Sequence, residues 1–281
     1  MTNPKMLLDQ FAIAPKKSLG QNFIHDPNVL EKIVTIAEIL PGDTVLEIGP
    51  GTGALTEHLA PLAGRVIAVE IDGRLESILR GRFARWPNIE FVFGDILETD
   101  LRALVPESYI VVANLPYYIT SAILRHLLET DRRAKRLILT VQLEVAERLT
   151  AKPDDMSLLS VSVQYYAKAK IAARINKAVF YPRPDVDSAV VRLDAYEKPP
   201  VDVPGDAQFF RIVRAGFAQK RKQLKNTLGD LLLAGKDDPI GHDFAGMVIT
   251  EAGIDPRRRA ETLTLEEWAA LTRAFVQAGL K

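Results

Sequence analysis

The sequence predicts an α/β protein in which helices cover a mostly parallel sheet, followed by a smaller helical domain. Three observations support this prediction. Apolar runs typical of strands alternate with helix-like periodicity from about residue 28 to 150. A glycine-rich turn, Gly49-Pro50-Gly51-Thr52-Gly53, follows the first strand-like run. With 281 residues, of which 47% are hydrophobic, the chain can bury a substantial core.

The first half of the chain supplies the alternating elements. Residues 28–40 carry apolar side chains at helical spacing and stop before Pro41-Gly42, which ends a helix. Residues 44–48 are a short apolar run into the glycine turn and predict a buried strand. By the same reading we expect helices at 54–62, 74–86 and 120–128 and strands at 65–71, 89–93, 109–113 and 137–141.

The second half of the chain changes character. Two further strands are expected at 170–176 and 188–193, and the proline-rich stretch 199–205 is the best candidate for a linker. The remaining periodicity is helical, with candidates at 209–217, 222–233, 243–252 and 265–278. The predicted organisation is therefore a domain over residues 1–198, with an N-terminal arm at 1–27, and a helical domain over residues 199–281.

Charge and residue usage exclude several classes of protein. The 36 basic and 36 acidic residues cancel, so any nucleic-acid contact must come from local clusters such as Lys16-Lys17, 132–136, 220–225 and 257–259. The chain has no cysteine, which excludes disulfides, thiolate metal sites and cysteine nucleophiles. The four histidines are scattered, so we expect no metal. No stretch has the length and apolarity of a membrane span or a signal peptide, and we expect a cytoplasmic protein.

The tetrapeptide Asn114-Leu115-Pro116-Tyr117 is the most informative motif, because it follows the apolar run at 109–113. Pro116 fixes its own φ and keeps Leu115 extended, so the turn is already shaped before a ligand arrives. Such a turn suits the binding of an amine, and the exocyclic amine of adenine is a demanding case, because it is a poor nucleophile. A site that methylates it must accept hydrogen bonds from its N–H groups. The Asn114 amide oxygen and a carbonyl of the turn are suitable acceptors, and Tyr117 offers a face for the base.

Residues at the preceding strand ends suggest a cofactor pocket beside this turn. The glycine turn allows a ligand to approach the backbone, although Gly49 to Ala54 also fits a dinucleotide fingerprint. Glu70 ends the second strand, where a carboxylate can bind both ribose hydroxyls of an adenosine cofactor; Asp72 is the rival. Asp95 ends the third strand, where a side-chain acceptor can meet the cofactor's adenine amine. A hydride-transfer enzyme has no use for the turn at the fourth strand, so the order favours methyl transfer.

Taken together, the motifs resemble the small-subunit (16S) ribosomal RNA adenine dimethyltransferases over nearly the whole chain. The matching stretches are Lys17-Ser-Leu-Gly-Gln-Asn-Phe23, Leu46-Glu-Ile-Gly-Pro-Gly-Thr-Gly53, Val69-Glu-Ile-Asp72, Gly94-Asp95, Asn114-Leu-Pro-Tyr117, Pro184-Asp-Val-Asp-Ser-Ala189 and Phe217-Ala-Gln-Lys-Arg-Lys-Gln-Leu-Lys-Asn-Thr-Leu228. The resemblance implies a Rossmann-like class I methyltransferase sheet, S-adenosylmethionine as methyl donor, and two adjacent adenosines near the 3′ end of 16S rRNA as substrate. It implies a role in ribosome biogenesis, and we expect a monomer acting on the immature small ribosomal subunit.

The resemblance also assigns roles to particular residues. The cofactor would be bordered by Asn22, Ile24, Gly49, Gly51, Glu70, Asp95 and Asn114. Asn114 and the Pro116 carbonyl would orient the target amine, while Tyr117 and Phe180 would enclose the base. Phe180 also has a simpler interpretation, as a core aromatic at the start of a strand. Lys220, Arg221, Lys222 and Lys225 would bind RNA, although the family often has consecutive arginines near this point.

Three alternatives remain open from the sequence. A dimethyltransferase of large-subunit rRNA would share the fold and the amine turn, but its C-terminal domain would differ. A ribosome-assembly or transcription factor could have kept the fold and lost catalysis. A dehydrogenase would use the same glycine turn, although nothing in it requires the turn at 114–117. Beyond these three, the turn alone is also compatible with a methyltransferase that acts on a protein or small-molecule amine.

Overall fold

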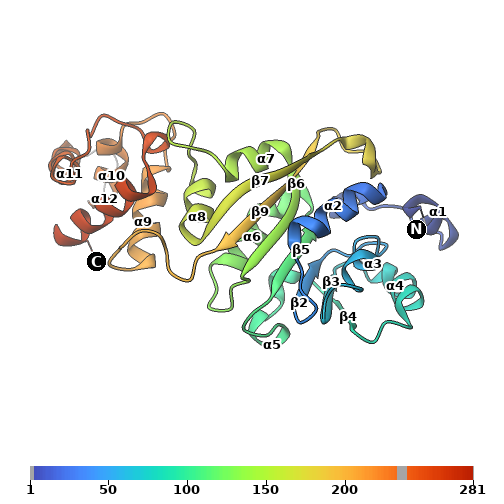
Figure 1. The fold of residues 1–281 in the computed structure, drawn as a ribbon. Helices are drawn as coiled ribbons and strands as arrows, with labels where there is room; N and C mark the ends of the chain where they lie inside the picture. The colour runs from blue at the N-terminus through green and yellow to red at the C-terminus, as the bar shows by residue number, and fades with distance from the viewer. Residues whose placement is uncertain (1–2, 233–238, 281) are drawn as a thin grey trace. The chain divides into compact units, whose positions relative to one another are not determined.

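The structure is a computed structural model that describes residues 3–232 and 239–280, and it divides into two compact units (Figure 1). The first unit comprises Met1–Glu147 and Lys168–Ala195, and the second comprises Arg148–Ala167 and Tyr196–Lys281. The chain passes from the first unit into the second for the last time between Ala195 and Tyr196, close to the domain boundary that we expected after residue 198. The segment Arg148–Ala167, which we expected in the first domain, instead groups with the C-terminal helices.

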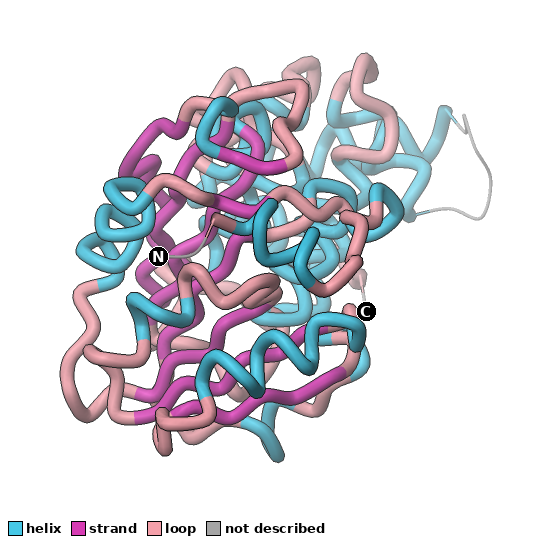
Figure 2. The backbone as a smooth tube through the Cα atoms, turned by 90° about the vertical axis from the view of Figure 1, so that its right-hand side faces the viewer, coloured by secondary structure: helices cyan, strands magenta, loops and turns pink. Residues whose placement is uncertain are grey.

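The first unit is built on a seven-stranded sheet with the order β4-β3-β2-β5-β6-β9-β7. The pairs β2–β3, β3–β4, β2–β5 and β5–β6 are parallel, and β9 pairs antiparallel with β6. Figure 2 shows these strands side by side with helices around them. The strands are β2 (Thr44–Ile48), β3 (Arg65–Glu70), β4 (Ile89–Phe93), β5 (Ile110–Asn114), β6 (Arg136–Gln142), β7 (Ala167–Ile175) and β9 (Ser188–Ala195).

The strand order reverses direction at β2, since β3 continues on one side of it and β5 on the other. Ligands of open α/β sheets bind beyond the carboxyl ends of the strands at such a reversal. Gly49 follows β2, Glu70 ends β3 and Asn114 ends β5, so the fold brings these expected site residues to one edge of the sheet. The α/β class and the parallel central sheet are thus confirmed.

Four helices connect strands β2 to β6: α3 (Thr56–Leu59), α4 (Glu76–Phe83), α5 (Leu101–Leu104) and α6 (Thr120–Leu128). Before β2 come α1 (Pro4–Gln10), in the N-terminal arm, and α2 (Pro27–Ala37). The Asp26 side chain accepts the N–H of Asn28 and caps α2, and Pro27 occupies its first turn. The helix ends at Ala37, three residues before the expected end, because Glu38 adopts a left-handed conformation with φ 48°.

A second, two-stranded sheet ties the N-terminal arm to the first unit. Strand β1 (Phe23–Ile24) pairs antiparallel with β8 (Phe180–Tyr181), with Ile24 opposite Phe180. The pairing places the arm, which precedes the main sheet in sequence, beside the loop that precedes β9. We did not predict this sheet, because two-residue strands leave no alternation to detect.

The second unit is helical, with α8 (Leu158–Tyr166), α9 (Asp206–Gly216), α10 (Leu224–Leu232), α11 (Pro239–Glu251) and α12 (Leu265–Gln277); α7 (Leu143–Leu149) spans the boundary between the units. Tyr165 of α8 stacks on Phe209 at 4.5 Å between ring centroids and donates a hydrogen bond to Asp206 at 2.7 Å. These contacts explain why α8 belongs with the C-terminal helices. Trp268 is fully buried against Gly216, where a Cβ would lie 2.4 Å from the indole.

Candidate active site

The glycine turn is shaped by backbone conformations that side chains avoid. Gly51 has φ 60°, and a Cβ on it would lie 2.8 Å from the Phe23 ring. Gly49 has φ 71°, and a Cβ there would meet only the Asn114 carbonyl oxygen, at 3.9 Å. The backbone at Gly49 therefore faces open space, as a turn that cradles a ligand requires.

Glu70 lies against this turn in a fixed orientation. Its side chain is buried, and its two carboxylate oxygens accept the N–H groups of Gly51 and Asp72, each at 2.9 Å. Burial raises the pKa of Glu70, while these backbone donors act in the opposite direction. Each oxygen keeps a second lone pair, so the carboxylate is oriented for further hydrogen bonds from a ligand.

Asp72, the rival to Glu70, is fully occupied by the protein itself. Arg74 binds both of its oxygens, through Nε at 2.8 Å and Nη2 at 2.6 Å, and Gln21 donates to it at 2.8 Å. The hydrogen bonds from Arg74, supported by Gln21, lower the pKa of Asp72 to about 2 despite its burial. Asp72 thus fastens the N-terminal arm to the end of β3, which leaves Glu70 as the candidate for the cofactor.

Asp95 is half-buried at the end of β4 and caps a short 3₁₀ turn, accepting the Leu97 N–H through Oδ1 at 2.9 Å. Its second carboxylate oxygen accepts no hydrogen bond from the described part of the chain. The expected role of Asp95 as an acceptor for a cofactor amine is compatible with this geometry.

Asn114 has a defined amide orientation. Its Nδ2 donates to the backbone oxygen of Asn22 at 2.7 Å, so its Oδ1 is the free end of the amide. The two residues lie 92 positions apart in sequence. Asn114 also lines a cavity of about 30 Å³ together with Ile24 and Gly49, so three of the expected cofactor residues border one space.

The turn after Asn114 offers one free carbonyl, and it is not the one we expected. The Pro116 carbonyl accepts the Thr120 hydroxyl at 3.0 Å and the Ile119 N–H at 3.4 Å. No donor among the described residues is bonded to the Leu115 carbonyl, whereas the Leu115 N–H donates to Thr140 at 3.1 Å. The acceptor that the turn leaves available is therefore at Leu115.

Tyr117 lines a second, larger cavity of about 660 Å³. Its hydroxyl shares a hydrogen bond of 2.9 Å with Ser188, and burial raises its pKa. The cavity lies between the N-terminal arm and the loop before β9; its walls are Pro15, Lys17, Gly20, Gln21, Asn22, Tyr117, Gln142 and residues 181–186. The tetrapeptide thus has Asn114 on the small cavity and Tyr117 on the large one.

Phe180 does not line the large cavity. The residue is 3% exposed, and it packs with Ile24, Leu30 and Ile33 in the core beneath the arm. The neighbouring Tyr181 is the aromatic residue that lines the cavity together with Tyr117. The structure therefore corresponds to the simpler interpretation of Phe180, and sequence reasoning missed Tyr181 because adjacent strand residues point to opposite sides.

Two of the basic clusters have different environments. Residues 220–222 lie in the exposed turn between α9 and α10, and Lys225 follows in the first turn of α10. The start of α10 contacts the second basic cluster, at 257–259, since the Leu224 N–H donates to the Arg258 carbonyl at 2.8 Å. None of Lys220, Arg221, Lys222 and Lys225 forms an ion pair with the described residues, so their charges are available to an anionic partner.

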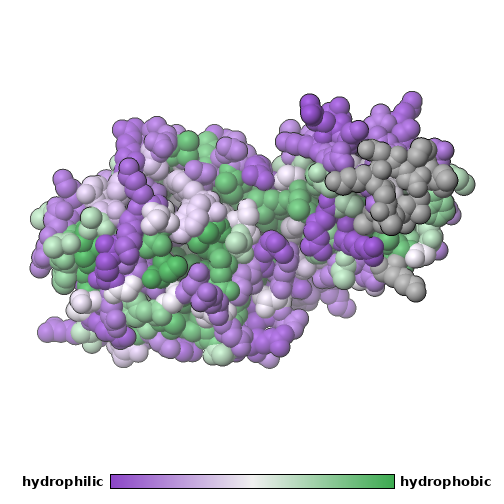
Figure 3. Space-filling view, turned by 180° about the vertical axis from the view of Figure 1, so that it is seen from behind, coloured by the Kyte–Doolittle hydropathy of each residue, from purple (hydrophilic) through white to green (hydrophobic). Residues whose placement is uncertain are grey.

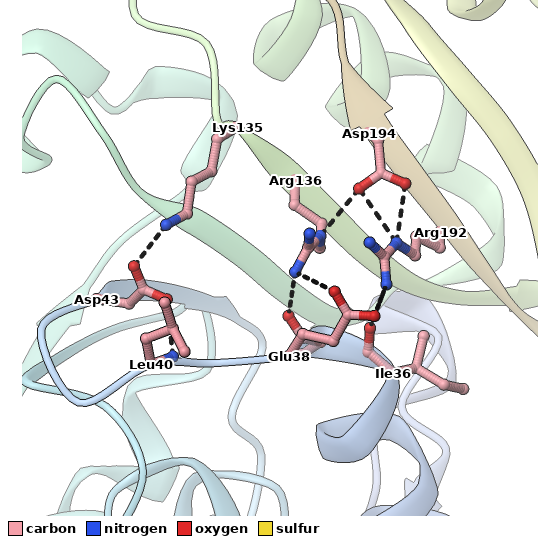
Figure 4. A network of polar contacts seen from close by, with 9 residues as sticks. Ile36, Glu38, Leu40, Asp43, Lys135, Arg136, Arg192 and Asp194 are labelled. Carbon is pink, nitrogen blue, oxygen red and sulfur yellow. Dashed lines mark hydrogen bonds and ion pairs between the residues drawn. The ribbon is translucent and has the colours of Figure 1, made fainter.

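The cluster at 132–136 is instead used within the first unit (Figure 4). Arg136 contacts Asp194 at 2.9 Å and Glu38 at 3.2 Å, and Lys135 pairs with Asp43. Arg192 binds the same two acids, Glu38 and Asp194, from β9. These pairs connect α2 to β6 and β9, which is a structural role that sequence alone could not separate from RNA binding.

Three further features complete the description of the structure. Within residues 3–232 and 239–280, no helix has the length and apolar character needed to cross a membrane. No group of three His, Asp or Glu side chains in the same residues is arranged to hold a metal ion. The face in Figure 3 is largely hydrophilic, with apolar patches between the polar residues.

Comparisons with known proteins agree with the site. A family model described as ribosomal RNA adenine dimethylase matches residues 13–271. Proteins named ribosomal RNA small subunit methyltransferase A are 44% identical over 279 residues in Geobacillus kaustophilus and 46% identical over 281 residues in Moorella thermoacetica. Each alignment covers 96% of this chain, and 94% and 95% of the respective relative.

Solved structures show the same fold. A dimethyladenosine transferase from Plasmodium falciparum has a TM-score of 0.78 and 28% identity, covering 92% of this chain and 98% of its own. A 23S rRNA methyltransferase, ErmE, has a TM-score of 0.72 and 29% identity, covering 91% and 100%. The chain is an S-adenosylmethionine-dependent methyltransferase with a class I methyltransferase sheet. It belongs to the ribosomal RNA adenine dimethylase family.

Proposed function

We propose that this enzyme dimethylates N6 of two adjacent adenosines near the 3′ end of 16S rRNA, in the immature small ribosomal subunit. It acts in the cytoplasm as a monomer. The observation that carries the proposal is the turn at 114–117, which has a free amide oxygen on the cofactor side and an aromatic ring on the larger cavity. The relatives named for the small subunit, which match at 42–46% identity over nearly the full chain, favour 16S over 23S rRNA.

The residues at the strand ends would hold the cofactor. Gly49 and Gly51 leave the backbone open to it, the oriented Glu70 carboxylate would accept its ribose hydroxyls, and Asp95 would accept its adenine amine. Asn22 and Ile24 would border it from the arm. When bound, S-adenosylmethionine supplies a methyl group on a sulfonium, which makes that methyl strongly electrophilic.

The amine of the target adenine would be oriented by two acceptors. Asn114 Oδ1 is one, because its Nδ2 is held by Asn22. The Leu115 carbonyl is the second, in place of the Pro116 carbonyl, which already accepts the Thr120 hydroxyl. Two N–H donations would draw the nitrogen lone pair out of the ring and towards the methyl, so positioning and electrostatics provide most of the rate without a dedicated base.

Dimethylation sets a further requirement on this arrangement. The first methyl removes one N–H, so the second transfer proceeds with one of the two hydrogen bonds. Tyr117 would stack on the base that enters the large cavity, with Tyr181 as the other aromatic wall, and this contact would offset the cost of unstacking the adenosine. The stacking role expected for Phe180 has no support in the geometry, since the ring is buried in the core.

In the second unit, Lys220, Arg221, Lys222 and Lys225 would bind rRNA phosphates. Lys220, Arg221 and Lys222 are exposed, Lys225 is half-buried, and none of the four forms an ion pair within the described residues, which supports this role. In the 132–136 cluster, by contrast, Arg132, Lys135 and Arg136 are each paired with an acid.

The proposed substrate is tested by transfer of radiolabelled methyl groups from S-adenosylmethionine to under-methylated 30S subunits, with 23S rRNA as the competing substrate. Dimethyladenosine in the 3′-terminal region of 16S rRNA is the expected product. Label on 23S rRNA alone would assign the enzyme to the large subunit. Cofactor binding with no label on either RNA would favour an assembly factor that has lost catalysis.

A further inference from the structure

We infer that the large cavity has a second subsite, which holds the nucleotide next to the target adenosine: Tyr118 stacks on its base, and Lys17 and Arg183 bind its phosphate. The inference rests on the proposed function, and it concerns residues to which that function gives no role. It is carried by three features of the first unit: the size of the cavity, an exposed ring at its rim, and two cations in its walls that pair with no acid among the described residues.

The cavity is larger than one base requires. Its volume of about 660 Å³ lies in the middle of the range of roughly 300–1,000 Å³ that holds whole small-molecule ligands. One purine ring against Tyr117 leaves part of this space open. RNA that presents one unstacked base to an enzyme also exposes the face of the next base, which gains by stacking on an aromatic side chain.

Tyr118 presents such a surface. The residue is 60% exposed, and its hydroxyl forms no hydrogen bond with the described residues. One edge of the ring lies against Gly20, where a Cβ would be 3.3 Å from Cδ1 and Cε1, and Gly20 is itself part of the cavity wall. Gly20 has φ 59°, so a side chain at this position would be strained as well as crowded against the ring. The ring is thus held at the rim of the cavity with most of its surface open.

The charges in the walls suit a phosphodiester. Lys17 comes from the N-terminal arm and Arg183 from the loop before β9, so they approach the cavity from two sides. Both are exposed, and neither pairs with an acid in the part of the chain that the structure describes. Asp185 is the one carboxylate among the lining residues, so the cavity has a net positive charge. Arg183 also has the planar fork that binds phosphate through two hydrogen bonds.

The base contact is tested with a double-mutant cycle, in which Tyr118 is changed in the enzyme and one nucleotide is changed in the RNA. Methylation is measured on 30S subunits that carry the adenosine pair and on subunits in which one adenosine of the pair is replaced by uridine, which stacks less. Tyr118→Ala should lower kcat/KM on the first substrate by roughly 5- to 150-fold and on the second by much less. Tyr118→Phe should keep the activity, and Phe11→Ala, which removes an exposed ring outside the cavity, should have no effect.

The phosphate contact is tested by the salt dependence of binding to the same subunits. Lys17→Ala and Arg183→Ala should each reduce the slope of log K against log salt by about 0.7, whereas Lys32→Ala, an exposed lysine outside the cavity, should leave it unchanged.

The outcomes separate this subsite from the proposed function. Wild-type enzyme that labels both substrates, combined with Tyr118→Ala losses that are absent or equal on the two, would overturn the base contact. Unchanged salt slopes in both cation variants would overturn the phosphate contact. Wild-type enzyme that labels neither substrate would overturn the proposed function, and the subsite with it.

Discussion

Glu47 is a buried acid beneath the glycine turn, and its environment predicts a strong effect of pH on stability. It lies in β2, and the residue is 1% exposed. The Thr56 hydroxyl donates to Oε2 at 2.7 Å, and Oε1 has no partner within residues 3–232 and 239–280. Burial raises the pKa of Glu47 from an ordinary value of 4.5 to about 8, against the hydrogen bond from Thr56. The folded protein therefore keeps this carboxyl neutral at pH 7.

The direction of the effect follows from the protons bound in each state. Between pH 4.5 and about 8, the folded chain binds a proton at Glu47 that the unfolded chain has lost. The free energy of unfolding consequently falls as pH rises, by about 1.4 kcal/mol per pH unit. Below pH 4.5 both states are protonated, so the contribution of this group is fully present there and is lost as pH rises through 8. The loss across the window is on the order of 4–5 kcal/mol.

Glu47→Gln isolates this contribution, since the amide keeps the shape and the acceptor for Thr56 but does not titrate. Denaturant unfolding of both proteins at about pH 5.5 and about pH 8 should show the variant gaining about 3 kcal/mol relative to wild type over that interval. Glu31→Gln, at an exposed position of α2, should show no such gain. Wild-type and Glu47→Gln stabilities that stay parallel across this range would refute the neutral carboxyl.

Further predictions concern the turn, the arm and the second unit. Gly51→Ala should lower the free energy of unfolding by about 1–3 kcal/mol and weaken cofactor binding, because Gly51 has φ 60° and a Cβ on it would lie 2.8 Å from the Phe23 ring. In the control Gly42→Ala, the added Cβ meets nothing within 4 Å, so the loss should be close to zero. Equal losses in the two variants would contradict this account. Asp72 has its pKa lowered to about 2, so it stabilises the fold above its ordinary pKa of 3.8 and loses that effect as pH falls through 2. Asp72→Asn should therefore lower the free energy of unfolding by about 2 kcal/mol at neutral pH and weaken its dependence on pH between about pH 4 and 2. An unchanged pH dependence would count against the role of the Asp72 carboxylate in holding the arm. Replacing residues 220–222 by alanine should raise KM for the 30S substrate and lower its salt slope by about 0.7 per lost phosphate contact, and an unaltered slope would exclude them from the RNA contact.

Much of the first unit was predictable because its signals are local. The strands at 44–48 and 89–93 and the helix at 120–128 match the structure residue for residue. Each combines an apolar run with a clear boundary signal, and such signals act over a few residues. The positions of Gly49, Glu70, Asp95 and Asn114 at strand ends follow from those boundaries together with the parallel sheet, so the edge that carries the site was predictable as well.

The features that were missed depend on contacts between distant residues. The bond between Asn114 and Asn22 fixes which end of the amide is free, and nothing in either segment announces it. The burial of Phe180 depends on its pairing with Ile24, and the availability of the Leu115 carbonyl depends on Thr120 binding the next one. The transfer of Arg148–Ala167 to the second unit depends likewise on Tyr165 packing against α9.

The measurement that tests the central claim most directly compares Asn114→Ala with the wild type on under-methylated 30S subunits, with S-adenosylmethionine binding measured in parallel. Removing an acceptor that acts on the reacting group costs on the order of 10²–10³ in rate in comparable sites. The wild type should form dimethyladenosine in 16S rRNA, while the variant binds the cofactor and transfers its methyl group at least about a hundredfold more slowly. Turnover by the variant close to that of the wild type would contradict the role of the Asn114 amide as the acceptor for the target amine.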